Sequence, residues 1–151
     1  MNDNILVEKG LKVSKKNIVN EKNYWKISGS HDGYLQKFGT IHEREIEFYP
    51  EQTKFIGFDK LLRKDKSKDI KFDIRFHLSP DTKVMKTQDN KSILIELEDE
   101  GWKFNCDNFN INIDNGLYLG IKNSYKENQN ICISGICQDD VQTIKWEITR
   151  L

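Results

Sequence analysis

The feature that most constrains the fold is a regular alternation, "IKFDIRFHL", at residues 70–78. Apolar residues occupy every second position, from Ile70 through Ile74 to Leu78, and charged or polar residues fill the positions between them. Because successive side chains of a β-strand point to opposite faces, this pattern predicts a strand with one buried face and one solvated face.

Further segments show weaker versions of this pattern, at residues 24–28, 43–49, 54–61, 92–98, 101–106, 109–114, 131–136 and 143–149. Turn-forming clusters such as "SPDTK", "QDNKS" and "DNG" separate several of them. No stretch of ten or more residues combines helical spacing with a capping signal. The chain also contains no alanine, the strongest helix former. Together these observations predict an all-β fold, an antiparallel two-sheet β-sandwich of about ten short strands.

The length of 151 residues predicts one domain over residues 1–151, which is enough chain to bury roughly 70% of the surface of the unfolded state. Residues 1–20 are polar and weakly patterned. Two interpretations of them stay open: an edge strand, or the truncated end of a larger upstream segment.

Charge and composition exclude several classes of partner. Lys plus Arg equals Asp plus Glu, at 24 each, which argues against a nucleic acid held by bulk charge. No apolar run approaches the roughly 20 residues of a membrane span, and the first residues lack the apolar core of a secretory signal. The three cysteines, Cys106, Cys132 and Cys137, sit at no metal-ligand spacing and are predicted to be buried and reduced.

Two of the three histidines lie within "SHDGYLQKFGTIHERE", residues 30–45. If residues 41–49 form a strand, His42 and Arg44 share a face with Ile46 and Phe48. That places both polar side chains on the apolar side of the sheet or at its rim. A cleft residue and a satisfied structural histidine fit this position equally well.

His31 begins the tripeptide "HDG", which is typical of a turn because Asp binds its own backbone and Gly tolerates a positive φ. Such a turn is expected to lift His31 and Tyr34 out of the sheet, either as turn fastenings or as ligand contacts. Asp32 either fixes the imidazole tautomer of its neighbour or caps the turn.

His77 and Arg75 lie on the polar face of the 70–78 strand, with side chains about 7 Å apart. They either bracket one anionic group or belong to a solvated sheet face. The sequence contains no nucleophile elbow, zincin motif or phosphate loop, so no catalytic residue is assigned. The histidine spacings of 11 and 35 match no local metal motif, and neither a metal nor a cofactor is expected.

Several longer motifs follow one another along the chain: "SHDGYLQKFGTIHEREIEF", "FIGFDKL", "FDIRFHLSPDTKV", "GWKF" and "NSYKENQNICISG". Together they resemble the C-terminal region of the heparinase II/III family, from about Lys12 to the end of the chain. Family members are polysaccharide lyases in which a helical toroid precedes an antiparallel β-sandwich. The resemblance therefore agrees with the fold predicted from the alternation.

The resemblance implies a β-elimination on uronic-acid polysaccharides. One group neutralises the C5 carboxylate, a base removes the adjacent proton, and an acid protonates the departing oxygen. It also implies that the chief Tyr, His and Asn come from the toroid, with another histidine from the early strands of the sandwich. Ser79 stands where the family often has a second histidine after "FHL".

Six residues are carried forward as candidates for substrate binding: His31, Tyr34, His42, Arg44, Arg75 and His77. We expect the first four to line a cleft between toroid and sandwich. The expected partners are an acidic uronate polysaccharide and an upstream helical toroid domain of the same enzyme, without which the module is expected to be inactive. The alternative is a stand-alone carbohydrate-binding or structural interaction module. Localisation is open, because full-length relatives are often periplasmic or secreted whereas this sequence shows no export signal.

Overall fold

The computed structural model describes residues 12–106, 108–122 and 124–151. The elements of this part of the chain are β1 (Val13–Glu21), β2 (Tyr24–His31), α1 (Leu35–Phe38), β3 (Thr40–Tyr49), the 3-10 helix η1 (Pro50–Gln52), β4 (Lys54–Arg63), β5 (Ile70–His77), β6 (Lys83–Lys86), β7 (Ser92–Leu97), β8 (Glu100–Asn105), β9 (Asn110–Ile121), β10 (Ser124–Cys137) and β11 (Val141–Arg150).

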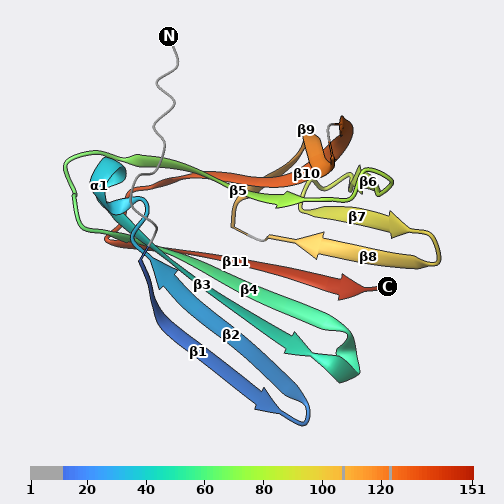
Figure 1. The fold of residues 1–151 in the computed structure, drawn as a ribbon, viewed down its shortest axis with the longest axis horizontal. Coiled ribbons are helices and arrows are strands. Elements are labelled where there is room, and N and C mark those ends of the chain that lie inside the picture. Colours follow the sequence, from blue (N-terminus) through green and yellow to red (C-terminus); the bar gives the residue numbers. More distant parts are fainter. Residues whose placement is uncertain (1–11, 107, 123) are drawn as a thin grey trace.

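The described strands form two antiparallel sheets (Figure 1). The large sheet has eight strands in the order β1-β2-β3-β4-β11-β8-β7-β6, and the small sheet has three in the order β5-β10-β9. The predicted all-β, two-sheet sandwich is thus confirmed. The sequence pattern assigned no strand to Lys83–Lys86, a short edge strand of the large sheet.

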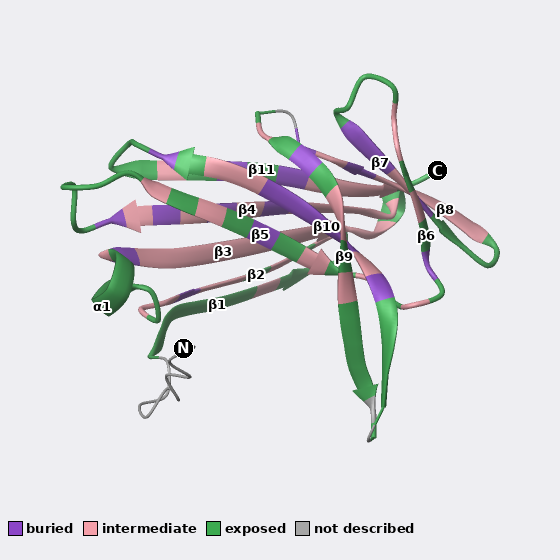
Figure 2. Cartoon of the chain, turned by 90° about the horizontal axis from the view of Figure 1, so that it is seen from above, coloured by how far each residue is buried: buried purple, intermediate pink, exposed green. Residues whose placement is uncertain are grey.

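The two sheets overlap only in part. Figures 1 and 2 show β5 and β10 lying over β4 and β11, while β1 and β2 extend outside the overlap. The core fills the overlap and its fully buried members come from both sheets, namely Ile93, Phe104, Ile111, Ile131, Ile133, Cys137 and Ile144. Consequently, one part of the large sheet has a face that the small sheet does not cover.

The alternation of β5 is realised as predicted. Ile74 is buried, Phe72 and Phe76 are partly buried against the core, and Arg75 and His77 are exposed. Phe76 contacts the rings of Phe104 and Trp146, with centroids 4.9 and 4.8 Å away. Burying these apolar groups stabilises the sandwich at roughly 25 cal/mol per Å² of surface removed from water.

The strand β1 and the tip of the hairpin between β9 and β10 lie outside the core. β1 lies at one edge of the large sheet, and residues 1–11 lie outside the described residues, so both interpretations of residues 1–20 stay predictions. The hairpin of β9 and β10 projects beyond the sandwich, where residues 124–127 are exposed (Figure 2).

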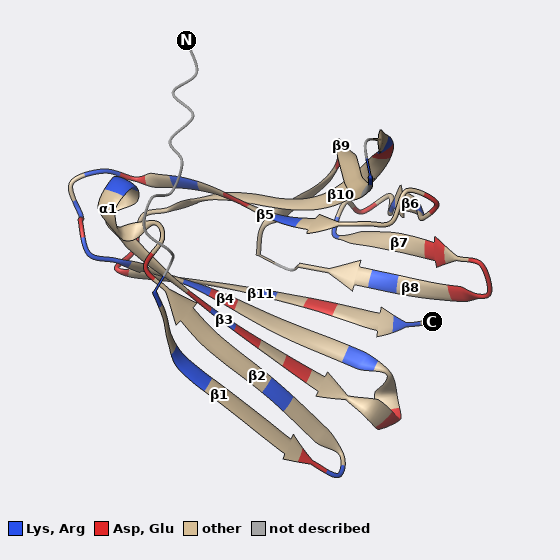
Figure 3. Cartoon of the chain, in the orientation of Figure 1, with Lys and Arg blue, Asp and Glu red and all other residues tan. Residues whose placement is uncertain are grey.

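Charged residues of both signs are interspersed along the strands (Figure 3). The three cysteines are buried, as predicted. In the described part of the chain, no helix is long and apolar enough to cross a membrane.

Candidate functional site

A pocket of about 520 Å³ opens where the small sheet ends above the large one. The large sheet and the segment around α1 form one wall, and β5 forms the other. The lining residues are His31, Tyr34, Phe38, Thr40, His42, Arg44 and Leu61, together with residues 70–75. Polar and aromatic side chains thus converge on one concavity, a common arrangement for small-molecule sites.

The β5 wall presents both side chains and backbone, because β5 is an edge strand of the small sheet. The Leu78 N–H donates to Gln129 O at 3.2 Å, which identifies the hydrogen-bonded pairs of the ladder between β5 and β10. By the alternation of antiparallel pairs, the N–H and C=O groups of Lys71, Asp73 and Arg75 point away from β10. These three backbone units face the open edge, which explains how six consecutive residues can line one pocket.

The opposite wall is set by strand register. His31 pairs with His42, and His42 pairs with Leu61, so the three share one face of the large sheet. One step along the strands, Arg44 lies opposite Asp59 on the same face. His42 and Arg44 therefore share their face with Ile46, as the sequence alternation predicts, and lie where the small sheet no longer covers it.

His31 is not lifted out of the sheet, in contrast to the sequence interpretation. It is the last residue of β2 and pairs directly with His42. The turn begins one residue later, where Leu35 N–H donates to Asp32 O at 2.9 Å. The sequence interpretation placed the start of the turn too early because the strand continues through Gly29 and His31, held by its neighbours on both sides.

A chain of hydrogen bonds links the two histidines to a buried carboxylate. His31 Nε2 lies 3.1 Å from His42 Nδ1, and His42 Nε2 lies 2.6 Å from Asp59 Oδ1. At the outer end, Gly33 N–H donates to His31 Nδ1 at 3.3 Å. Every ring nitrogen of both histidines therefore has a partner.

Asp59 is fully buried and accepts three hydrogen bonds. Besides His42, the donors are Arg44 Nε at 2.7 Å and Trp146 Nε1 at 2.8 Å. Burial, the largest influence, raises the pKa of Asp59, but the hydrogen bonds from His42, Arg44 and Trp146 and the charge of Arg44 outweigh it and leave the pKa below its usual value. The carboxylate is therefore ionised at neutral pH.

Arg44 uses one edge of its guanidinium for Asp59 and keeps the other for the pocket. Its side chain is 39% exposed, and Cζ lies 5.9 Å from the centroid of the Phe76 ring. Within the described residues, its terminal amino groups have no hydrogen-bond partner. Arg44 is thus a rigidly held cation with free donors, the kind of group that recognises a carboxylate or sulfate.

Tyr34 and Phe38 add an aromatic rim to the pocket. The Tyr34 ring lies edge-on to His31, with centroids 5.1 Å apart, and contacts Phe38 at 6.3 Å. The short helix α1 starts after Tyr34, includes Phe38 and is capped by Gly39, whose φ of 62° is left-handed. A Cβ there would also lie 2.4 Å from the Cβ of Asp65, so this turn requires glycine.

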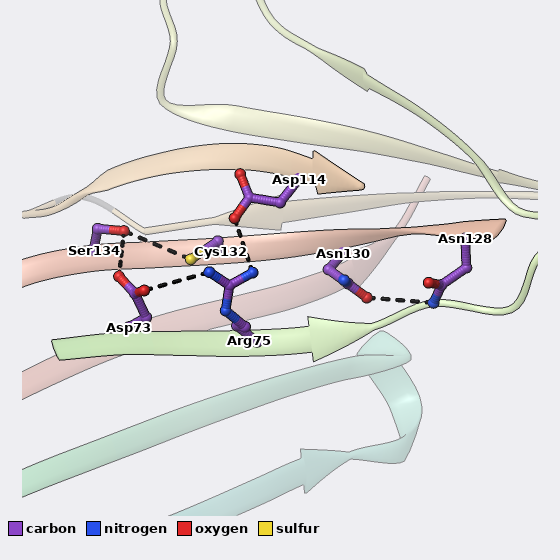
Figure 4. Close-up of polar contacts among 7 residues, drawn as sticks. All are labelled: Asp73, Arg75, Asp114, Asn128, Asn130, Cys132 and Ser134. Carbon is purple, nitrogen blue, oxygen red and sulfur yellow. Dashed lines mark hydrogen bonds and ion pairs between the residues drawn. The ribbon is translucent and has the colours of Figure 1, made fainter. Parts of the chain in front are cut away.

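The remaining two predicted residues lie differently. The Arg75 guanidinium is held on the outer face of the small sheet by Asp114 at 2.9 Å and Asp73 at 3.4 Å (Figure 4). His77 is exposed on the same face of β5, opposite Asn130, and does not line the pocket. The structure therefore brings His31, Tyr34, His42 and Arg44 together, places Arg75 at the edge of the pocket, and leaves His77 outside it.

Asp59 was missed by the sequence analysis. The available signal was its position in "KFIGFDKL": in a strand, Asp59 lies on the same face as the apolar Phe55 and Leu61. A carboxylate on the buried face of a strand must be paired or hydrogen-bonded, since an isolated buried charge is too costly. In the described part of the chain, no group of three or more His, Cys, Asp or Glu residues could hold a metal ion.

The histidine environment gives a pH-dependent stability. Desolvation, the largest cause, together with neighbouring His42 lowers the pKa of His31 below 6.5. Between the folded and unfolded pKa values the unfolded chain binds more protons, so the free energy of unfolding falls as the pH drops below about 6.5. Urea unfolding at several pH values should show this loss, with a shallower slope in His31→Gln. Equal slopes in the two proteins would contradict it.

Fold and site define a β-sandwich module with a polar, aromatic-rimmed pocket at the margin between its sheets. The chain belongs to the family described as heparinase II/III-like, C-terminal, whose model matches residues 2–147. A comparison with curated proteins finds no match.

Solved structures with a similar fold include one of a heparan sulfate lyase and two of a heparinase III. A heparan sulfate lyase HepC mutant from Pedobacter heparinus is 11% identical, with a TM-score of 0.78 over 92% of this chain. A heparinase III gene product is 13% identical, with a TM-score of 0.73 over 93% of this chain. The same gene product with methylated lysines gives 14% identity and a TM-score of 0.67 over 87%. The chain spans 20–22% of the length of these proteins, and at such identities the likeness shows the fold alone.

Proposed function

We propose that this chain is the β-sandwich module of a polysaccharide lyase that acts on uronic-acid polysaccharides by β-elimination. Its pocket binds an acidic sugar and forms one side of a cleft that a helical toroid domain completes. The observation that carries the proposal is the convergence of Arg44, His31 and Tyr34 on one pocket in a chain of the heparinase II/III family.

The chemistry of the pocket fits a uronate. The free amino groups of Arg44 suit a sugar carboxylate, and the rings of Tyr34 and Phe38 offer apolar surface to a sugar face. The backbone groups along the edge of β5 add donors and acceptors for hydroxyl groups. No residue of the pocket is assigned the removal of the C5 proton, since the resemblance places the chief catalytic groups in the toroid.

Calorimetric titration with heparan sulfate, heparin and alginate oligosaccharides tests the binding. We expect the 151-residue chain to bind at least one of them, and Arg44→Gln to weaken that binding about tenfold or more, because a hydrogen bond to a charged group is lost. The matched control is Arg150→Gln, which removes a charge paired with Glu100 away from the pocket. Equal affinities of both variants would contradict the assignment of Arg44.

Activity is tested by the ultraviolet absorbance of the unsaturated product. The chain alone should produce none above background, whereas a lyase that includes a toroid should. Rapid turnover by the purified 151 residues would overturn the proposal that the toroid is needed. A stand-alone carbohydrate-binding module is the second candidate, favoured by the fact that this chain lines the pocket with its own residues; binding unchanged by an added toroid domain would support it.

A further inference from the structure

We propose that Asp59 is a positioning residue that fixes the tautomers of His42 and His31, so that His31 is held as a neutral hydrogen-bond acceptor at the pocket. The contact of His31 with a sugar rests on the proposed function, whereas the assignment of the tautomers rests on the geometry alone. Asp59 itself touches neither solvent nor the pocket and acts through two intervening imidazoles.

At the inner end of the hydrogen-bond chain, Asp59 determines which histidine nitrogens donate and which accept. Ionised Asp59 can only accept, so the His42 nitrogen at 2.6 Å from it must carry a proton on Nε2. A neutral His42 then has a lone pair on Nδ1, which accepts from His31 Nε2 at 3.1 Å. His31 is therefore protonated on Nε2 and unprotonated on Nδ1.

At the outer end, the Gly33 N–H independently favours the same assignment of donors and acceptors. The Gly33 backbone N–H can only donate, and its acceptor is His31 Nδ1. A proton on that nitrogen would oppose the Gly33 N–H. Both ends of the chain thus select one arrangement, whereas a histidine pair without such ends could adopt either.

The geometry around Asp59 explains why a carboxylate is required. Oδ1 accepts from both His42 and Arg44, and Oδ2 accepts from Trp146. An amide has only one oxygen, and its NH₂ group must donate. An asparagine would oppose a donor in either orientation, because its NH₂ group would face the Arg44 N–H on one side or the Trp146 N–H on the other.

The tautomer of His31 decides whether its Nδ1 accepts a hydrogen bond from a ligand or donates one. The contact between Gly33 and His31 Nδ1 is exposed and, at 3.3 Å, at the long end of the range. A hydroxyl group of a sugar can take the place of the Gly33 N–H at this acceptor. Reversal of the two tautomers would present an N–H there instead.

The test is ¹⁵N NMR of the histidine rings of the 151-residue chain, recorded above the range in which the imidazoles are protonated. In the wild type we expect Nε2–H on both His31 and His42, with the His42 Nε2 proton slow to exchange. In Asp59→Leu, which removes the acceptor altogether, we expect His42 to lose its single Nε2–H tautomer and to show a mixture of Nε2–H and Nδ1–H. Asp140→Leu, the same change at an exposed aspartate that pairs with Lys66, should leave both rings as in the wild type.

A His42 ring that keeps a single, slowly exchanging Nε2–H in a folded Asp59→Leu variant would overturn the proposal. If that variant does not fold, the wild type alone decides: a His42 Nε2 proton that is protected from exchange supports the proposal, and a rapidly exchanging one overturns it. None of these readouts needs a ligand. Lack of oligosaccharide binding by the wild type would therefore count against the proposed function and leave the positioning role standing on the NMR result.

Discussion

Gly57→Ala is expected to destabilise the protein by at least about 3 kcal/mol. The Cβ that alanine adds would lie 2.0 Å from Cε2 and Cζ2 of Trp146, far inside van der Waals contact. The indole is 4% exposed and enclosed by the core, so it has no free space to move into. Displacing it both overpacks the core and breaks its hydrogen bond to Asp59.

Denaturant unfolding measures this effect, and a matched glycine provides the control. Gly101 lies in β8 of the same sheet, where a Cβ would meet Leu151 at an ordinary 3.5 Å. Gly101→Ala should therefore stay within about 1 kcal/mol of the wild type. If the two variants unfold at the same denaturant concentration, the indole does not lie against Gly57. Loss of the protected indole proton of Trp146 in Gly57→Ala would link the clash to the site.

The strand register places Gly57 between the core and the pocket. Gly57 pairs with Ile46 on β3 and with Trp146 on β11, and Asp59 follows on the same face of β4. The absence of a side chain at one position lets the indole reach the carboxylate from the neighbouring strand. The buried half of the site is thus built by the same packing that forms the core.

Local alternation was sufficient to predict the strands that have one buried face. Residues 70–78 were expected and Ile70–His77 form β5. The pattern failed at the first half of β10, which was predicted over residues 131–136 but begins at Ser124. Residues 124–127 are exposed on both faces, and the buried side chains that follow are the polar Asn128 and Asn130, so no apolar alternation marks this part of the strand.

The site was predictable only in its local part. The spacing of His42 and Arg44 placed both on one face of a strand, and the structure agrees. Asp59 is 15 residues from Arg44 and 87 residues from Trp146. No spacing rule connects such distant residues, because strand order and register bring them together. For the same reason, the pattern on β5 could not tell that His77 lies outside the concavity that His31 and His42 share.

Phe104→Ala is expected to reduce stability by about 3–5 kcal/mol, the usual cost of truncating a fully buried aromatic side chain. Phe104 is 0% exposed, and its ring lies parallel to that of Trp146 at 6.2 Å and edge-on to that of Phe76. Removing it leaves a cavity at the centre of the overlap between the sheets. The neighbouring strands are held by their ladders and can collapse only partly into it.

Thermal and denaturant unfolding of Phe104→Ala should be compared with Phe38→Ala, the same truncation at a ring that is 48% exposed. The second variant should lose no more than about 1.5 kcal/mol, because little apolar surface is taken from the core. If both truncations cost the same, the overlap of the two sheets is not the main source of stability. A large difference, with the Trp146 indole proton exchanging faster in Phe104→Ala, would show that the core supports the ring that holds Asp59 in place.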